Sequence, residues 1–302
     1  MGNYHFIVNA LAGSGRGGKA FAKAEESLKA RGMGYEVAIT EYPRHAMELT
    51  QQAIAAGADC IVAVGGDGTV NEVASAVNQA RREGALVTMG IFPFGTGNDL
   101  ARALEIPIDP EGAVEVLLSG NIRAIDGGEV NGRFFINVAG FGFDVDVLER
   151  TNNLKQRHSG MTSYLLGIFQ ALTHLRSLHL TISGGKDVDG LELPFETDAL
   201  LVCAGAGKYF GGGMKALPFA DPFSGLFDVC LIKKVGVLRF LTLLPGFIKG
   251  KHTKLKIVRY FRANELMIES DVECKVQLDG EICLNTPAHF RVVKGAIEMI
   301  MP

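Results

Sequence analysis

The sequence of 302 residues contains no tryptophan, few prolines and no Cys-X-X-Cys pair. Its five scattered cysteines predict neither a disulfide framework nor a zinc site, and we expect reduced thiols in a cytoplasmic protein. No apolar run reaches the ~18 residues that a membrane-spanning helix requires. We find no signal peptide before the first predicted strand, which begins at Tyr4. The net charge of −3 lacks the basic excess that nucleic-acid binding requires, so we expect no nucleic-acid partner.

The first part of the chain alternates between short apolar runs and helical patterns. Such alternation predicts a doubly wound, mostly parallel sheet with helices on both faces. We assign residues 1–122 to a nucleotide-binding α/β domain, and we expect an apolar final strand, at about residues 294–302, to return to it. The predicted strands are 5–8, 35–40, 60–64 and 88–92, and the predicted helices are 19–30, 46–56, 71–82, 99–104 and 112–118.

From residue 123 onward, strand-like runs separated by turn residues dominate the sequence. Asn131-Gly132 between two such runs is a strong hairpin signal. Two helical patterns, near 163–175 and 237–248, interrupt the strands. We therefore predict that residues 123–293 form a β-rich domain, an antiparallel β-sandwich or barrel.

The most informative segment is Gly65-Gly66-Asp67-Gly68-Thr69-Val70-Asn71, which lies between a predicted buried strand and a predicted helix. Glycines allow the main chain to approach a phosphate closely, and the helix start directs N–H groups and the positive end of the helix dipole at it. A carboxylate among such amides, Asp67, is useful if a cation or a hydroxyl proton lies between it and the phosphate. The segment therefore predicts phosphoryl transfer.

A second glycine turn, Pro93–Arg102, also follows a strand and begins a helix. Thr96 offers a hydroxyl to a phosphate, Asn98 can bridge neighbouring groups, and Asp99 suits the first helical turn. Alone, this turn would be read as an ordinary capped helix. Two such turns after successive strands predict a shared binding crevice, because strand carboxyl ends meet at one edge of the sheet.

Three further segments allow two interpretations each. Residues 13–18 satisfy G-X-G-X-X-G, so this loop either binds a phosphate with Asn9 or belongs to a dinucleotide site with Glu41 as its acid. Asp279-Gly280-Glu281 is either a turn with solvated acids or the position of a general base, Glu281, for a substrate hydroxyl. Asp126 either joins a metal network or caps a turn.

These segments together resemble the soluble bacterial diacylglycerol kinases, which share their catalytic core with sphingosine and ceramide kinases. The resemblance covers Gly65–Asn71, 95–102 and 279–281, and also Phe134–Phe143 and Tyr209–Leu217. Gly65–Asn71 alone is shared with NAD kinases. The resemblance implies two domains, the first similar to NAD kinase and phosphofructokinase, with the active site in the cleft between them.

The same resemblance implies roles for individual residues. Glu281 would accept the substrate proton, with Asp279 beside it and Asp67 also catalytic. Asp67, Asp99 and Asp126 would hold Mg²⁺ through water. ATP would be bound by Asn9, Ala10, Gly13, Thr40, Gly65, Gly66, Asp67, Gly68, Thr69, Asn71, Thr96 and Asn98.

The resemblance also implies a second, structural magnesium ion, bound by the carbonyl groups of Asp221 and Leu226. The chain departs from the family at this position, because Ser224-Gly225 replaces the usual Asp-Gly. A neutral hydroxyl is a poor ligand for a hard cation. Asn9-Ala10 also replaces the usual Asn-Pro of the first loop.

We therefore predict an ATP-dependent lipid kinase that phosphorylates the hydroxyl of diacylglycerol or a related lipid alcohol. The alternatives are an NAD kinase and a non-catalytic nucleotide-binding sensor. A lipid substrate predicts a peripheral position at the inner membrane face. The candidate contact is Val235–Lys256, whose apolar residues are followed by lysines; a core-packed helix is the other interpretation. An uncovered sheet edge is compatible with a homodimer.

Overall fold

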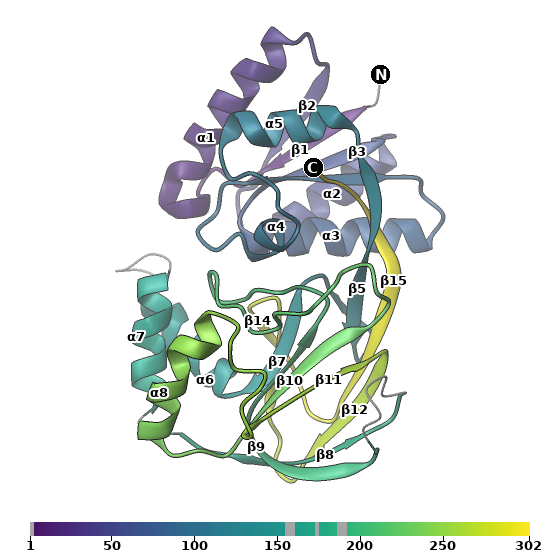
Figure 1. Ribbon diagram of the computed structural model, residues 1–302. Coiled ribbons are helices and arrows are strands. Elements are labelled where there is room, and N and C mark those ends of the chain that lie inside the picture. Colours follow the sequence, from purple (N-terminus) through teal and green to yellow (C-terminus); the bar gives the residue numbers. More distant parts are fainter. Residues whose placement is uncertain (1–2, 155–160, 173–174, 186–191) are drawn as a thin grey trace. The chain divides into compact units, whose positions relative to one another are not determined.

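The computed structural model describes residues 3–154, 161–172, 175–185 and 192–302. The chain forms two compact units, and their elements are labelled in Figure 1. Unit 1 consists of residues 1–125 and 295–302, and unit 2 consists of residues 126–294. The chain therefore passes between the units twice, within β5 (Ile122–Val130) and within β15 (Ala288–Ile300).

Unit 1 contains the predicted parallel sheet, with strand order β4-β3-β1-β2. The end of β15 adds a fifth parallel strand beside β4, with Glu298 opposite Thr88. Among the strands that the structure describes, β2 pairs only with β1, and the homodimer expected from an uncovered edge stays a prediction. The strands are β1 (Tyr4–Val8), β2 (Tyr35–Ile39), β3 (Cys60–Gly65) and β4 (Thr88–Pro93).

Helices cover both faces of this sheet. On one face, Phe21 and Leu28 of α1 (Ala12–Ala30) and Leu117 of α5 (Pro110–Ser119) bury apolar surface against Phe6 and its neighbours. On the other face, α2 (His45–Ala55) packs against α3 (Asp67–Arg82), and α4 (Asp99–Ala103) is a short helix after β4.

Two helices begin at least four residues before their predicted starts. α3 begins at Asp67 instead of residue 71, because the last residues of the glycine turn already form its first turn. α1 begins at Ala12 instead of residue 19, although Gly13, Ser14 and Gly15 have positive φ angles that interrupt it. Glycine lowers helix propensity, and this hid both starts in the sequence.

Unit 2 is the predicted antiparallel β-rich domain, since its strands pair in the order β14-β13-β7-β9-β8-β12-β15, with β10 between β9 and β11. The hairpin at Asn131-Gly132 is confirmed, because it joins β5 to β6 with φ angles of 50° and 80°. The remaining strands are β6 (Arg133–Phe135), β7 (Val138–Gly142), β8 (Leu178–Ser183), β9 (Phe195–Gly205), β10 (Phe227–Lys233), β11 (Val258–Ala263), β12 (Glu265–Ser270), β13 (Lys275–Leu278) and β14 (Glu281–Asn285).

Three helices of unit 2 bury apolar side chains in a second core beside β9 and β10: α6 (Phe143–Leu154), α7 (Met161–Ala171) and α8 (Val237–Ile248). The prediction of α8 is confirmed. α7 overlaps the predicted region 163–175 but begins two residues before it, and residues 173 and 174 of that region lie outside the described residues. α6 was not predicted. No helix in the described part of the chain is long and apolar enough to cross a bilayer.

Candidate active site

The predicted nucleotide-binding residues of unit 1 lie at the carboxyl edge of its parallel sheet. Asn9 follows β1, Thr40 follows β2, Gly66 follows β3, and Gly95 comes shortly after β4. The chain order reverses between β1 and β3, since β2 lies beyond one of them and β4 beyond the other. In open α/β sheets, ligands bind outside the strand ends at such a switch point.

Glycines allow three loops to meet by their backbones at this edge. A Cβ atom on Gly95 would lie 2.2 Å from the Cα atom of Gly66, and a Cβ atom on Gly13 would lie 2.8 Å from the carbonyl oxygen of Phe94. Real Cβ atoms do not tolerate these distances. The structure therefore brings together the loops that begin near residues 9, 65 and 94, and a side chain at Gly95 would separate two of them.

Asp67 connects the two glycine turns. Its Oδ1 atom accepts hydrogen bonds from the backbone N–H groups of Asp99, at 2.6 Å, and Leu100, at 3.4 Å. Burial raises the pKa of Asp67, while these N–H donors act in the opposite direction. The carboxyl group at the start of α3 is thus held at the start of α4, close to the backbone of Asp99.

Polar side chains fix the shape of the same loops. The Asn9 amide donates to the hydroxyl of Thr69 at 3.2 Å, and its backbone N–H donates to Val64 O at 2.9 Å. Asn98 makes two hydrogen bonds with the backbone of Gly95, as acceptor at 3.0 Å and as donor at 3.2 Å.

The other predicted residues of this region occupy more varied positions. Thr96 and Gly68 are exposed. The carbonyl of Ala10 accepts from Gly18 N at 3.1 Å, and the backbone N–H of Thr40 donates to Val8 O at 2.9 Å. Asn71 lies one turn into α3 and accepts from the Ser75 hydroxyl at 3.4 Å.

In unit 2, Asp279 and Gly280 form the two-residue turn between β13 and β14, with φ angles of 47° and 89°. The carboxylate of Asp279 accepts hydrogen bonds from three successive backbone N–H groups, those of residues 136, 137 and 138, at 2.7, 3.0 and 2.9 Å. This contact fixes the turn against the chain before β7. Asp279 therefore positions the turn.

Glu281 directly follows that turn. Its side chain is 49% exposed and lies 3.8 Å from a guanidinium nitrogen of Arg133. An exposed carboxylate on a clamped turn can accept a proton from a bound hydroxyl without first moving its backbone.

Asp126 lies against the loop before β10. Its Oδ2 atom accepts from Gly225 N at 2.6 Å, and its backbone N–H donates to Pro222 O at 2.7 Å. These two hydrogen bonds cap the loop, which is one of the two interpretations of Asp126; its part in a metal network stays a prediction.

The carbonyl groups of Asp221 and Leu226 both face the hydroxyl of Ser224, which donates to them at 2.9 and 3.3 Å. These are the two ligands implied for a structural magnesium. Ser224 closes the loop without a charged ligand, so these residues do not fit a second metal.

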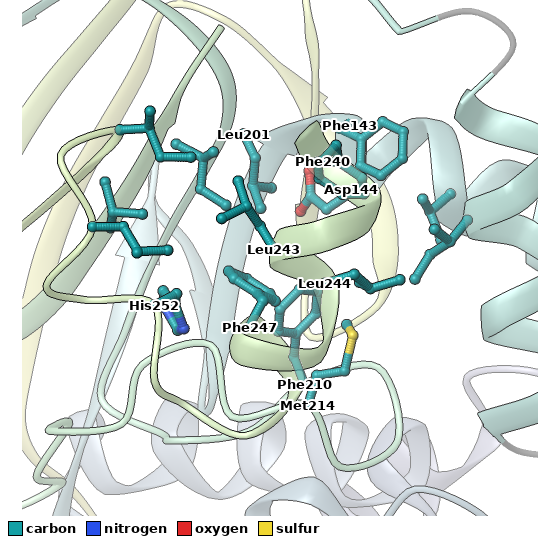
Figure 2. Close-up of a pocket in the computed structure, with 16 residues that line it drawn as sticks. Phe143, Asp144, Leu201, Phe210, Met214, Phe240, Leu243, Leu244, Phe247 and His252 are labelled. Atoms are coloured by element: carbon teal, nitrogen blue, oxygen red, sulfur yellow. The ribbon is translucent and has the colours of Figure 1, made fainter. Parts of the chain in front are cut away.

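Unit 2 also contains an apolar pocket that the sequence did not predict (Figure 2). Its lining includes residues of α6, α7 and α8, and the space between its walls, open solvent included, is about 530 Å³. Fourteen of the sixteen lining residues are apolar, and the two exceptions are Asp144 and His252.

Asp144 is the one carboxylic acid of the pocket lining. Burial raises its pKa to about 7, and the nearby charge of Asp146 acts in the same direction, while a hydrogen bond from Gln277 opposes both. The sequence signal, an acid between apolar residues at the start of a helix, was too common to identify it.

The chain matches two known family models, one after the other along the sequence. Residues 3–130 match the diacylglycerol kinase catalytic domain, and residues 137–301 match the YegS C-terminal NAD kinase beta sandwich-like domain. The chain belongs to the diacylglycerol kinase family. It is an enzyme, an ATP-dependent lipid kinase.

Curated relatives extend over nearly the whole chain. A diacylglycerol kinase of Mycobacterium tuberculosis (strain CDC 1551 / Oshkosh) is 30% identical over 310 residues, which cover 100% of this chain and 96% of the relative. A diacylglycerol kinase of Staphylococcus haemolyticus (strain JCSC1435) is 31% identical over 277 residues, covering 91% and 81%.

Solved structures share the same two-unit fold. A diacylglycerol kinase from Bacillus anthracis str. Sterne superposes with a TM-score of 0.75 at 23% identity, covering 99% of this chain and 97% of that one. Another chain from that organism gives a TM-score of 0.81 at 25% identity, with the same coverage. The predicted fold class and family are therefore confirmed.

Proposed function

We propose that this kinase transfers the γ-phosphoryl group of Mg-ATP to the hydroxyl of diacylglycerol or a related lipid alcohol, with Glu281 as proton acceptor. One observation carries the choice of a lipid over a second nucleotide. The unit that contains Glu281 also contains a pocket whose lining is almost entirely apolar, which suits an acyl chain.

The nucleotide belongs, in this proposal, to the carboxyl edge of the unit 1 sheet. Backbone N–H groups of residues 65–69 and 95–98 would bind the phosphates, with Asn9, Ala10, Gly13, Thr40 and Asn71 around them. The close approach of Gly66 and Gly95 supports this, because neither residue places a side chain between the two turns.

Magnesium would be held through water by Asp67 and Asp99, which both belong to unit 1. The implied contribution of Asp126 stays a prediction. Carboxylates suit this hard cation, and the two acids of unit 1 begin helices joined by the Asp67 hydrogen bond. When bound, the ion neutralises charge on the phosphates. The chain's own amides then orient the γ-phosphoryl group.

A lipid hydroxyl does not ionise at neutral pH, so it needs a proton acceptor as it attacks. Glu281 has the exposure for this role, and Asp279 has the contacts to keep its turn in place. Both features support Glu281 as the base and Asp279 as its positioning residue.

The direct test is transfer of labelled phosphate from ATP to a panel of lipid alcohols, with NAD in the same panel. We expect a labelled lipid phosphate from diacylglycerol or a close relative, dependent on magnesium. Labelled NADP instead would favour the NAD kinase, and nucleotide binding without any transfer would favour the sensor.

We propose further that an anionic bilayer contacts unit 2 at the start of α8 and the loop that follows it. Leu238 is 82% exposed, and the lysines at 249, 251, 254 and 256 are all exposed. Phe240, Leu244 and Phe247 are instead buried, so the core-packed interpretation holds for the inner face of the helix. Exposed apolar and basic groups together complement an anionic lipid surface.

Sedimentation with vesicles that contain phosphatidylglycerol tests this surface. Changing Lys251 and Lys254 to Glu should reduce the bound fraction, while changing Lys19 and Lys23, which are exposed on α1, should not. Leu238→Ser and Leu86→Ser form a second matched pair, because both leucines are largely exposed. Equal effects of test and control variants would remove this surface from the proposal.

A further inference from the structure

A buried glutamine links the apolar pocket to the turn before Glu281. The Nε2 atom of Gln277 donates to Oδ2 of Asp144 at 3.2 Å, and its Oε1 atom accepts from Gly280 N at 2.8 Å. Gln277 and Asp144 are each 3% exposed. The orientation of the amide is fixed, because an ionised carboxylate only accepts hydrogen bonds and a backbone N–H only donates one.

Asp144 has little freedom to move away from this contact. Its Oδ1 atom accepts from Val145 N at 2.9 Å. Its Oδ2 atom packs so closely on β7 that a Cβ atom at Gly140 would lie 2.4 Å from it. The pocket wall, Gln277 and the turn therefore form one hydrogen-bonded path within unit 2.

We infer that Gln277 is a positioning residue for Glu281, and that it couples the turn before this base to Asp144 in the wall of the acyl-chain pocket. The inference rests on the proposed function. The turn is then held on both sides, by the Asp279 carboxylate against residues 136–138 and by Gln277 against the pocket wall. A change at the pocket wall reaches the base through two hydrogen bonds.

The coupling has a pH-dependent signature, because Asp144 changes charge near neutral pH. The ionised carboxylate is the stronger acceptor for the Gln277 amide, which in turn polarises the bond to Gly280 N. The other ionisable groups around Asp144 are Asp146 on its own helix, Cys203 on β9 and His252 in the pocket lining.

A charge exchange across the pair provides the kinetic test. At about pH 8.5, Gln277→Glu should lower kcat by about 10- to 100-fold, because two carboxylates then face each other and displace the turn. Adding Asp144→Asn should recover most of the lost kcat. The new amide at position 144 then donates to the glutamate at position 277, which still accepts from Gly280 N. The KM for ATP should not change. A double variant as slow as the single one would overturn the inference.

The second readout does not depend on activity. It is an NMR measurement on protein labelled with 13C-aspartate and 15N-glycine. This labelling selects the amide signals of the glycines in the four Asp-Gly pairs of the sequence, including Gly280. The Gly280 amide signal should titrate near pH 7 in the wild type and lose this titration in Asp144→Asn. An amide signal that does not respond to Asp144 would overturn the coupling. If the wild type phosphorylated no lipid alcohol, the proposed function would fail, and this titration would still decide the link.

Discussion

Single carboxylates in this kinase differ in role because their hydrogen-bond partners differ. Asp279 accepts from three backbone N–H groups and stabilises a turn, whereas Glu281, two residues later, is exposed and faces one guanidinium group. Asp144 is buried beside a neutral amide. These three acids of unit 2 thus differ in role. Asp279 holds a turn in place, Glu281 is the proposed proton acceptor, and Asp144 has a pKa near neutral pH.

Asp279→Asn should destabilise unit 2 by about 1–3 kcal/mol, because an amide NH₂ would then face backbone N–H donors in a partly buried position. Urea unfolding measures this loss. Asp271→Asn, at an exposed acid in the same part of the chain, is the control and should leave the midpoint nearly unchanged. Equal midpoints for both variants would contradict the clamping role.

The stability of the protein should fall with pH through the ionisation of Asp144. Its folded pKa of about 7 lies above the ordinary value of 3.8, so folding favours the protonated form. This contribution is fully present below about pH 4 and is lost as the pH rises through 7. Between pH 5 and 8, the urea midpoint of Asp144→Asn should decrease less than that of the wild type. Parallel decreases would show that Asp144 does not titrate there.

At the scale of elements, the proposed nucleotide site depends on two loops that approach each other closely at Gly66 and Gly95. Gly95→Ala should abolish most ATP binding, because its methyl group would lie 2.2 Å from Gly66 Cα and separate the two turns. Gly34→Ala is the matched control, since a Cβ atom there meets nothing within 4 Å. Calorimetric titration with Mg-ATP measures both variants, and normal affinity in Gly95→Ala would contradict the proposed phosphate site.

Elements whose pattern is local were predictable from the sequence. The Asn131-Gly132 hairpin follows from turn chemistry, and α8 follows from its apolar periodicity. α6 was missed because Phe143, Val145 and Val147 alternate with Asp144 and Asp146, which is a strand pattern. Packing against α7 and the sheet overrides this alternation, so that Asp144 is buried as well.

The candidate site was predictable to the extent that it is encoded in short segments. The glycine turns were recognised from composition and position, and the structure brings Gly66, Gly95 and Asp67 together with Asp99. The contact between Asp144 and Gln277 joins residues 133 positions apart. No single sequence reveals such a pair, because the contact depends on how β7, β13 and α6 pack.

For the whole molecule, the proposed function divides the parts of this kinase between the two units. The proposed phosphate-binding loops belong to unit 1, while the pocket and Glu281 belong to unit 2. The proposed reaction therefore uses residues of both units. The central step of this proposed reaction is the transfer of the hydroxyl proton of the lipid to Glu281.

The most direct test is single-turnover transfer of labelled phosphate from ATP to diacylglycerol by the wild type, by Glu281→Gln and by the exposed control Glu269→Gln. The account predicts that Glu281→Gln slows transfer by about 10²- to 10⁴-fold with an unchanged Kd for ATP, and that the control matches the wild type. Transfer by Glu281→Gln within a few-fold of the wild-type rate would contradict it.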